Sequence, residues 1–205
     1  MGILSDSKIL EKINSGEIVI NPYDHSQLGS NSYDVRMSNK LLVYLDPILD
    51  PKEDQATTTI DIPKEGLVIH PGKLYLGVTI EHTETLKDVI MFEGKSSLAR
   101  LGLFVHITSG FGDVGFKGHI TLEISCIQPI RIYPNMKIGQ VYYQSVDGFV
   151  INPYSSKIDA KYNNTNPLPM KSQMFKNFQQ EEKEFKIKRV GDSGLSFTPD
   201  GEIEK

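Results

Sequence analysis

Two neighbouring segments say most about this chain: GKSSLARLG at residues 94–102 and TSGFGDVGFKGHITLE at residues 108–123. Every other residue from 120 to 124 is apolar, so a strand with a side-chain period of two turns these residues to one face and Glu123 to the other. Four glycines precede Glu123, and glycine lets the backbone approach a ligand closely or adopt positive φ. We therefore predict a β-strand that presents a carboxylate beside a glycine-rich turn. The glycines are Gly110, Gly112, Gly115 and Gly118.

The first segment carries side chains that suit phosphate oxygens. Lys95 and Arg100 are cations, and Ser96 and Ser97 offer hydroxyl groups. Ser96 is also placed to open a helical turn, whose free N–H groups favour an anion. The segment therefore predicts a site for a phosphorylated ligand.

Composition narrows the classes of function. The chain has 205 residues, is 39% hydrophobic and carries a net charge of −4, which fits one globular domain with a tail. It lacks the excess of positive charge that binding to nucleic acids or anionic membranes requires, so we expect neither as a partner. No apolar run reaches transmembrane length and no signal-peptide pattern is present, so a cytoplasmic protein is expected.

The single cysteine, Cys126, lies between Ile124 and Ile127 and is expected to be a small core or interface residue. Nucleobase deaminases that use zinc need a pair of cysteines to hold the metal. One cysteine cannot supply that pair. If this chain deaminates cytosine, it does so without zinc.

The order of short segments predicts a mainly β domain. A short helix is expected after Ser5 and Asp6, ending at Ser15 and Gly16. Short strands follow, separated by Pro, Gly and Asn, as in a β-sandwich or barrel. In the segments 74–80 and 103–107, apolar residues alternate with small or polar ones, so each is expected to pack one face. The other expected strands are 17–20, 33–37, 41–45, 130–133 and 140–143, with a polar loop at 46–59.

The character of the chain changes after residue 152. We expect a β domain over residues 1–152 and a C-terminal arm over residues 153–205. The arm is rich in Pro, Ser and Asn and then in charge, so its later part is expected to be a flexible tail, with a short helix around 174–183.

The segment 94–102, the Asp-containing turn and the Thr-Leu-Glu strand together resemble the signature of the dCTP deaminase family, which is related to the trimeric dUTPases. Four further segments fall in family order, and the resemblance covers roughly residues 1 to 165. It implies an all-β, distorted β-barrel or jelly-roll-like, dUTPase-like fold with a few short helices. It also implies a homotrimer whose active sites are shared between neighbouring subunits. The further segments are 27–36, 70–76, 133–140 and 159–162.

Hydrolytic deamination adds water at C4 of cytosine, protonates N3 and releases ammonia. A carboxylate shielded from solvent can carry out the proton transfers that these steps need. By resemblance Glu123 shuttles the protons, Ser96 and the backbone near Ser109 position the water, and Arg100 stabilises charge. From the residues alone, an equally good interpretation of Arg100 is a residue that forms a salt bridge at a subunit interface. The catalytic residues expected are Glu123, Ser96, Arg100 and Ser109.

The same resemblance implies the contacts to the nucleotide. The triphosphate is expected to bind at Lys95, where relatives carry Arg. Mg²⁺ is expected to bridge the phosphate oxygens, with no protein side chain as a ligand of the metal. Asp113 is expected to accept the deoxyribose 3′-hydroxyl, with the arm as a lid that carries Thr165 where relatives carry Gln. Taken alone, Asp113 reads as a turn former. The nucleotide-binding residues expected are Lys95, Ser97, Ile107, Thr108, Gly110, Asp113, Phe116, Tyr154, Lys161 and Tyr162.

The function expected from the resemblance is zinc-independent deamination of dCTP to dUTP. The run Thr108 to Phe111 is similar to that of bifunctional members that also hydrolyse dUTP to dUMP and pyrophosphate, and Gly110 would leave room for a second water. Two alternatives stay open. One is a dUTP diphosphatase only, and the other is a nucleotide-binding regulator without catalysis.

Overall fold

The computed structural model describes residues 2–163 and 166–180. The chain divides into two compact units, one made of the residues up to 44 with 57–171, the other of 45–56 with the residues from 172 onward. A helical stretch at 175–180 lies in the second unit, which confirms the expected helix as far as the described residues reach. The functional boundary at residue 153 stays a prediction. No helix in the described ranges is long and apolar enough to cross a bilayer.

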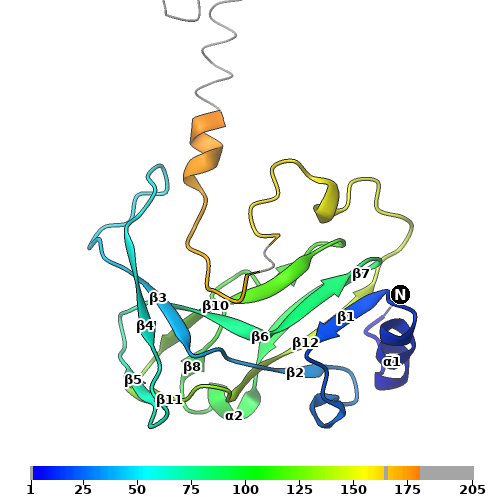
Figure 1. The fold of residues 1–205 in the computed structure, drawn as a ribbon, viewed down its shortest axis with the longest axis horizontal. Coiled ribbons are helices and arrows are strands. Elements are labelled where there is room, and N and C mark those ends of the chain that lie inside the picture. The colour runs from blue at the N-terminus through cyan, green and yellow to red at the C-terminus, as the bar shows by residue number, and fades with distance from the viewer. Residues whose placement is uncertain (1, 164–165, 181–205) are drawn as a thin grey trace, which may run out of the picture. The chain divides into compact units, whose positions relative to one another are not determined.

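The first unit is built mainly from strands (Figure 1), which confirms the predicted all-β class. Its helical elements are α1 (Asp6–Asn14), η1 (His25–Gln27), α2 (Ser96–Ala99) and η2 (Tyr154–Ser156). Its strands are β1 (Ile18–Asn21), β2 (Tyr33–Arg36), β3 (Lys40–Tyr44), β4 (Thr57–Asp61), β5 (Leu67–Ile69), β6 (Tyr75–Thr85), β7 (Asp88–Gly94), β8 (Leu103–Phe104), β9 (Phe111–Gly112), β10 (Lys117–Cys126), β11 (Ile130–Ile132) and β12 (Lys137–Ser145).

The strands form three antiparallel sheets. The largest has the order β4-β3-β6-β10-β8, with β1 also paired to β6. A second sheet has the order β2-β12-β7-β9, and β11 pairs with β5 in the third. Each of these orders has two ends, so the described strands make open sheets rather than a closed barrel. The long strand β10 runs between β6 and β8 and carries Glu123.

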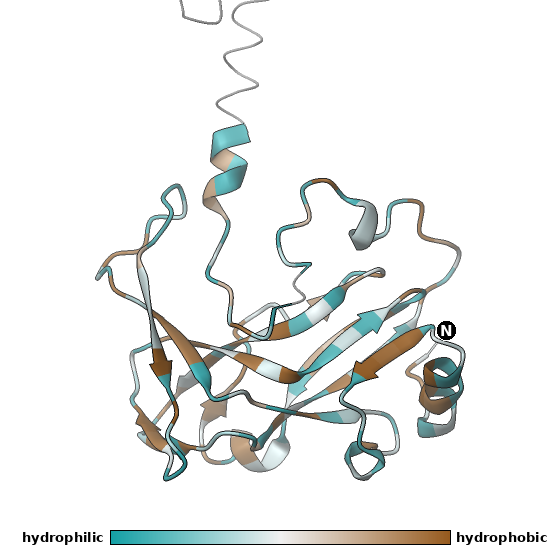
Figure 2. Cartoon of the chain, in the orientation of Figure 1, coloured by the Kyte–Doolittle hydropathy of each residue, from teal (hydrophilic) through white to brown (hydrophobic). Residues whose placement is uncertain are grey.

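Helix α1 forms where the sequence predicts it. The Ser5 side chain accepts a hydrogen bond from the backbone N–H of Lys8, and Gly16 adopts a φ of +74° just after the helix. Ile9 is fully buried, and Figure 2 shows a strongly apolar β1 and an α1 with both polar and apolar residues. The helix therefore packs an apolar face and leaves a polar one in water.

Strand β6 corrects one expectation about burial. The apolar residues Leu76 and Val78 are buried as expected, but so are Thr79 and Glu81 on the opposite face. The Thr79 hydroxyl donates to the backbone carbonyl of Glu81 at 2.9 Å, so a polar group is buried with its hydrogen bond made. From Thr79 onward the small and polar face of β6 is the inner one.

Two further boundaries differ from the expectation. Strand β8 ends at Phe104, and Ile107 is 58% exposed, although the alternating pattern places it with the buried Leu103 and Val105. The expected polar loop ends at Ala56, because residues 57–59 already pair with β3. Both errors arise because the deciding contact, with β3 or with Glu123, lies outside the local alternation of residues.

Candidate active site

The carboxylate of Glu123 is held by two donors from the segment that follows β8. The backbone N–H of Ile107 donates to Oε2 at 2.8 Å, and the Ser109 hydroxyl donates to Oε1 at 2.7 Å. Leu122 and Ile124 are fully buried on the opposite face of β10, which confirms the predicted alternation. The Ile107 bond also explains why its side chain leaves the sheet: its N–H turns toward the carboxylate. Glu123 is thus fixed in orientation and half-buried.

The turn that carries Ser109 is anchored on β7. The backbone N–H of Phe92 donates to the carbonyl of Gly110 at 2.7 Å, and β9 pairs with β7 immediately afterwards. A Cβ at Gly110 would lie 2.7 Å from the Phe92 carbonyl oxygen, so glycine is required here by close backbone packing. The Cβ position at Gly110 is therefore filled by protein, and the room expected there for a second water is not on that side. Thr108 is exposed beside it.

Sequence reasoning missed a histidine beneath this turn. The Nε2 atom of His106 lies 3.3 Å from a carboxylate oxygen of Glu93, and the imidazole ring packs edge-on against Phe92. Its Nδ1 atom is buried without a hydrogen-bond partner among the described residues. The only sequence signal was its position one residue before Ile107.

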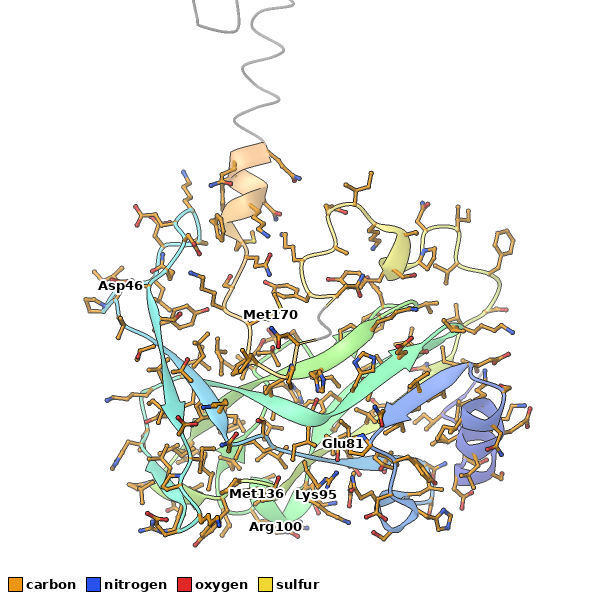
Figure 3. The ribbon with its side chains drawn as sticks, viewed as in Figure 1. Asp46, Glu81, Lys95, Arg100, Met136 and Met170 are labelled. Atoms are coloured by element: carbon orange, nitrogen blue, oxygen red, sulfur yellow. The ribbon has the colours of Figure 1, made fainter. Side chains whose placement is uncertain are left out.

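The expected phosphate-binding segment forms α2 and its flanks. A helical turn begins at Ser96, as predicted, with Lys95 as the residue before it. Ser96 and Ser97 are exposed, whereas the ammonium of Lys95 contacts the Asp34 carboxylate at 2.5 Å. Arg100 donates from Nη1 to the carbonyl of Ser96 at 2.9 Å, and Figure 3 shows Lys95 and Arg100 beside α2. The segment is a polar, cation-bearing turn.

Within one chain these two groups have different bonding partners. Among the described residues, no hydrogen bond or ion pair joins Glu123 to Ser96 or Arg100; the carboxylate contacts the segment after β8, and Arg100 contacts its own turn. The expected placement of Arg100 beside the carboxylate stays a prediction. Several apolar side chains close in sequence to one group or the other are exposed. They are Leu101, Phe104, Ile107, Phe111 and Ile127.

A third group forms where the arm meets the glycine turn. Tyr154 donates from its backbone N–H to the carbonyl of Val114 at 2.7 Å, and its hydroxyl accepts from the backbone N–H of Tyr162 at 2.9 Å. Lys157, which sequence reasoning missed, places its ammonium 3.3 Å from Asp113 and over the Tyr154 ring. The expected lid thus contacts Asp113, the residue expected to bind the deoxyribose 3′-hydroxyl.

The remaining expected residues lie nearby in the chain. Phe116 is half-buried and packs against the core, and its carbonyl accepts from the backbone N–H of Thr85 at 3.1 Å. Lys161 is half-buried. Thr165 lies outside the described residues.

Burial sets the state of two groups on β10. Burial raises the pKa of the Cys126 thiol, which is 7% exposed and packs in the core. The expectation of a core cysteine is confirmed, and the thiol is a poor nucleophile. Burial also lowers the pKa of His119, which packs edge-on against His82. In the described part of the chain, no group of three or more His, Cys, Asp or Glu could hold a metal ion.

Comparison with known proteins places this chain in a family. The model of the family described as dCTP deaminase-like matches residues 3–146. The chain belongs to that family. The chain is 52% identical over 178 residues to a "dCTP deaminase, dUMP-forming" of Hathewaya histolytica. The match covers 86% of this chain and 99% of that protein. A protein of the same name from Clostridium beijerinckii is 48% identical over 177 residues, with the same coverage.

The fold has a solved counterpart. It matches the crystal structure of 2′-deoxycytidine 5′-triphosphate deaminase from Agrobacterium tumefaciens with a TM-score of 0.57 and 20% identity. The match covers 71% of this chain and 48% of that chain. This likeness shows the fold alone.

Proposed function

We propose that the protein converts dCTP to dUMP, with ammonia and pyrophosphate as the other products. The observation that carries the proposal is the Glu123 carboxylate, fixed by the Ile107 N–H and the Ser109 hydroxyl on a half-buried strand face. The names of the relatives, dUMP-forming dCTP deaminases, support the substrate and the final product.

The deamination step follows from a single positioned carboxylate. Glu123 removes a proton from water as the oxygen bonds to C4 of cytosine, and passes that proton to N3. Glu123 then takes the proton of the new C4 hydroxyl and gives it to the amino group, so that C4 becomes a carbonyl as the C–N bond breaks and ammonia leaves. The balance is dCTP plus water giving dUTP plus ammonia. Ser109 keeps the carboxylate in the orientation that both transfers need.

The second step hydrolyses dUTP to dUMP and pyrophosphate. Support for this step comes from the names of the relatives rather than from space at Gly110. Mg²⁺ bound to the triphosphate would neutralise part of its charge. Lys95 and the exposed hydroxyls of Ser96 and Ser97 fit phosphate oxygens. The roles of Asp113 at the sugar and of Tyr154, Lys161 and Tyr162 in a lid remain part of this proposal.

The complete site is proposed to form between chains of a homotrimer. One chain supplies Glu123 with the turn at 107–110, and a neighbour supplies Ser96 and Arg100. The lack of any bond between these groups within one described chain supports this arrangement, as do the exposed apolar side chains close to both in the sequence. A head-to-tail interface of this kind closes into a ring with one site per interface.

A direct assay tests the proposed function. Purified protein is incubated with dCTP and Mg²⁺, and dCTP, dUTP and dUMP are separated by ion-exchange chromatography over time, with a parallel incubation on dUTP. Formation of dUMP from dCTP supports the proposal. Accumulation of dUTP would limit the enzyme to deamination. Turnover of dUTP alone would indicate a diphosphatase, and binding without product would indicate a regulator.

A further inference from the structure

Asp34 on β2 contacts two lysines. Its Oδ1 atom lies 2.5 Å from the ammonium of Lys95, and its Oδ2 atom lies 3.2 Å from the ammonium of Lys137. The side chain of Asp34 is 18% exposed, compared with 43% for that of Lys137. The carboxylate is thus enclosed by the two ammonium groups, while Lys137 keeps access to solvent.

The order of the second sheet produces this arrangement. Strand β12 runs between β2 and β7, so that Gln140 lies opposite Asp34 on one side and Glu93 on the other. Lys137 is the first residue of β12, and the register shifts between Lys137 and Gly139. Such a bulge re-aims a side chain, here at the end of the sheet from which the chain enters α2.

Several charged groups meet at this end of the sheet. Two ammonium groups contact the one carboxylate of Asp34, and the carboxylate of Asp24 also interacts with the positive charges of Arg36 and Lys137. Arg36, also on β2, forms an ion pair at 2.7 Å with the fully buried Glu81. Asp34 thus joins Lys137 to Lys95, the residue directly before the exposed Ser96 and Ser97.

We propose that Lys137 is a second phosphate-binding lysine, and that Asp34 holds the ammonium groups of Lys95 and Lys137 side by side. The ligand class is the terminal phosphates of a nucleoside triphosphate. A lysine contributes a point charge rather than a bidentate fork, and two of them can share a chain of phosphates that one cannot neutralise. This inference rests on the proposed function for the identity of the nucleotide.

The first test measures phosphate binding without catalysis. Inorganic tripolyphosphate is titrated into the full-length protein by isothermal titration calorimetry at low salt. We expect Lys137→Met to weaken binding about tenfold, because a charge-assisted hydrogen bond is lost, and Lys137→Arg to retain most of the affinity. Lys73→Met is the matched control, since it removes the same charge from an exposed turn. Lys137→Gln, with a polar replacement, serves as a second variant, and thermal melts check that each variant is folded.

The second test separates binding from structure. We expect Lys137→Met to raise the KM for dCTP about tenfold while kcat stays within about twofold of the parent value. Unchanged affinity for tripolyphosphate, or an equal loss in Lys73→Met, would overturn the inference. A fall in kcat with unchanged KM and affinity would also overturn it, because Lys137 would then act on structure. A folded parent protein that binds tripolyphosphate through Lys137 but leaves dCTP unchanged would refute the proposed function and spare this inference.

Discussion

The hydroxyl of Ser109 donates a 2.7 Å hydrogen bond to Oε1 of Glu123, joining the glycine-rich turn to the carboxylate strand. Both residues belong to the segment 108–123, and the bond exists because the chain leaves the sheet after Val105 and returns on β9. It sets the direction of the carboxylate without help from a ligand. The turn and the proposed catalytic group are therefore one structural unit.

Replacing Ser109 with Ala should slow deamination. The change removes a hydrogen bond to a charged group, which contributes about 1.5–3 kcal/mol, so we expect kcat to fall about ten- to one-hundredfold. Steady-state ammonia release from dCTP measures the effect. Ser125→Ala, on the same face of β10, is the control and should retain kcat. A Ser109→Ala enzyme as fast as its parent would remove Ser109 from the proposed site.

Replacing Gly110 with Ala should disturb the same turn by a different route. The added Cβ would lie 2.7 Å from the carbonyl oxygen of Phe92, so the turn must move and its anchoring bond to β7 weakens. We expect a loss of most of the deaminase activity together with a lower melting temperature. Gly2→Ala is the control, because its Cβ meets no atom within 4 Å. Normal activity in Gly110→Ala would contradict the packing reason given for this glycine.

The buried Glu81 should be central to stability rather than to chemistry. It is fully buried and accepts hydrogen bonds from the backbone N–H and the guanidinium of Arg36 and from Gln27. Glu81→Gln leaves the guanidinium without its counter-charge, so we expect a loss of about 3–5 kcal/mol in the free energy of unfolding. Urea denaturation measures it. Glu84→Gln, half-exposed on the other face of β6, should cost less than about 1 kcal/mol; similar losses in both variants would refute the account of Glu81.

The ion pairs of Glu17 make the stability of the fold depend on pH. Hydrogen bonds from Lys87 and Lys12 lower its pKa to about 2 from an ordinary value of 4.5. Because the folded pKa is the lower one, this stability is present above pH 4.5 and is lost as the pH falls from there to about 2. We expect the parent protein to melt at a higher temperature than Glu17→Gln at neutral pH, and the gap to close in that acid range. A gap that is constant with pH, or one matched by the control Glu65→Gln, would show that ionisation of Glu17 is not its cause.

The sequence predicted what depends on local periodicity. The alternation around Glu123 and the start of a helical turn at Ser96 are both confirmed, because each is set by neighbours within a few residues. The prediction that Ile107 is buried was wrong, because its N–H donates to the carboxylate of Glu123, sixteen residues further on. Periodicity contains no information on such a contact.

Contacts between distant segments could not be predicted at all. Asp34 meets Lys137 through strand register, and Lys157 meets Asp113 because the arm returns onto the glycine turn. The resemblance named Asp113 and the arm but gave no pairing between them. Pairings of this kind require the order of strands in each sheet.

The central claim is that one catalytic site is built from two chains, and subunit complementation tests it most directly. Glu123→Gln and Arg100→Ala each disable one half, so each variant alone should convert almost no dCTP. After co-expression in equal amounts, a ring of three with random mixing contains intact sites at about one quarter of its interfaces, so we expect about a quarter of the parent rate of dUMP formation. Activity that stays at the level of the separate variants would contradict the claim and assign the whole site to a single chain.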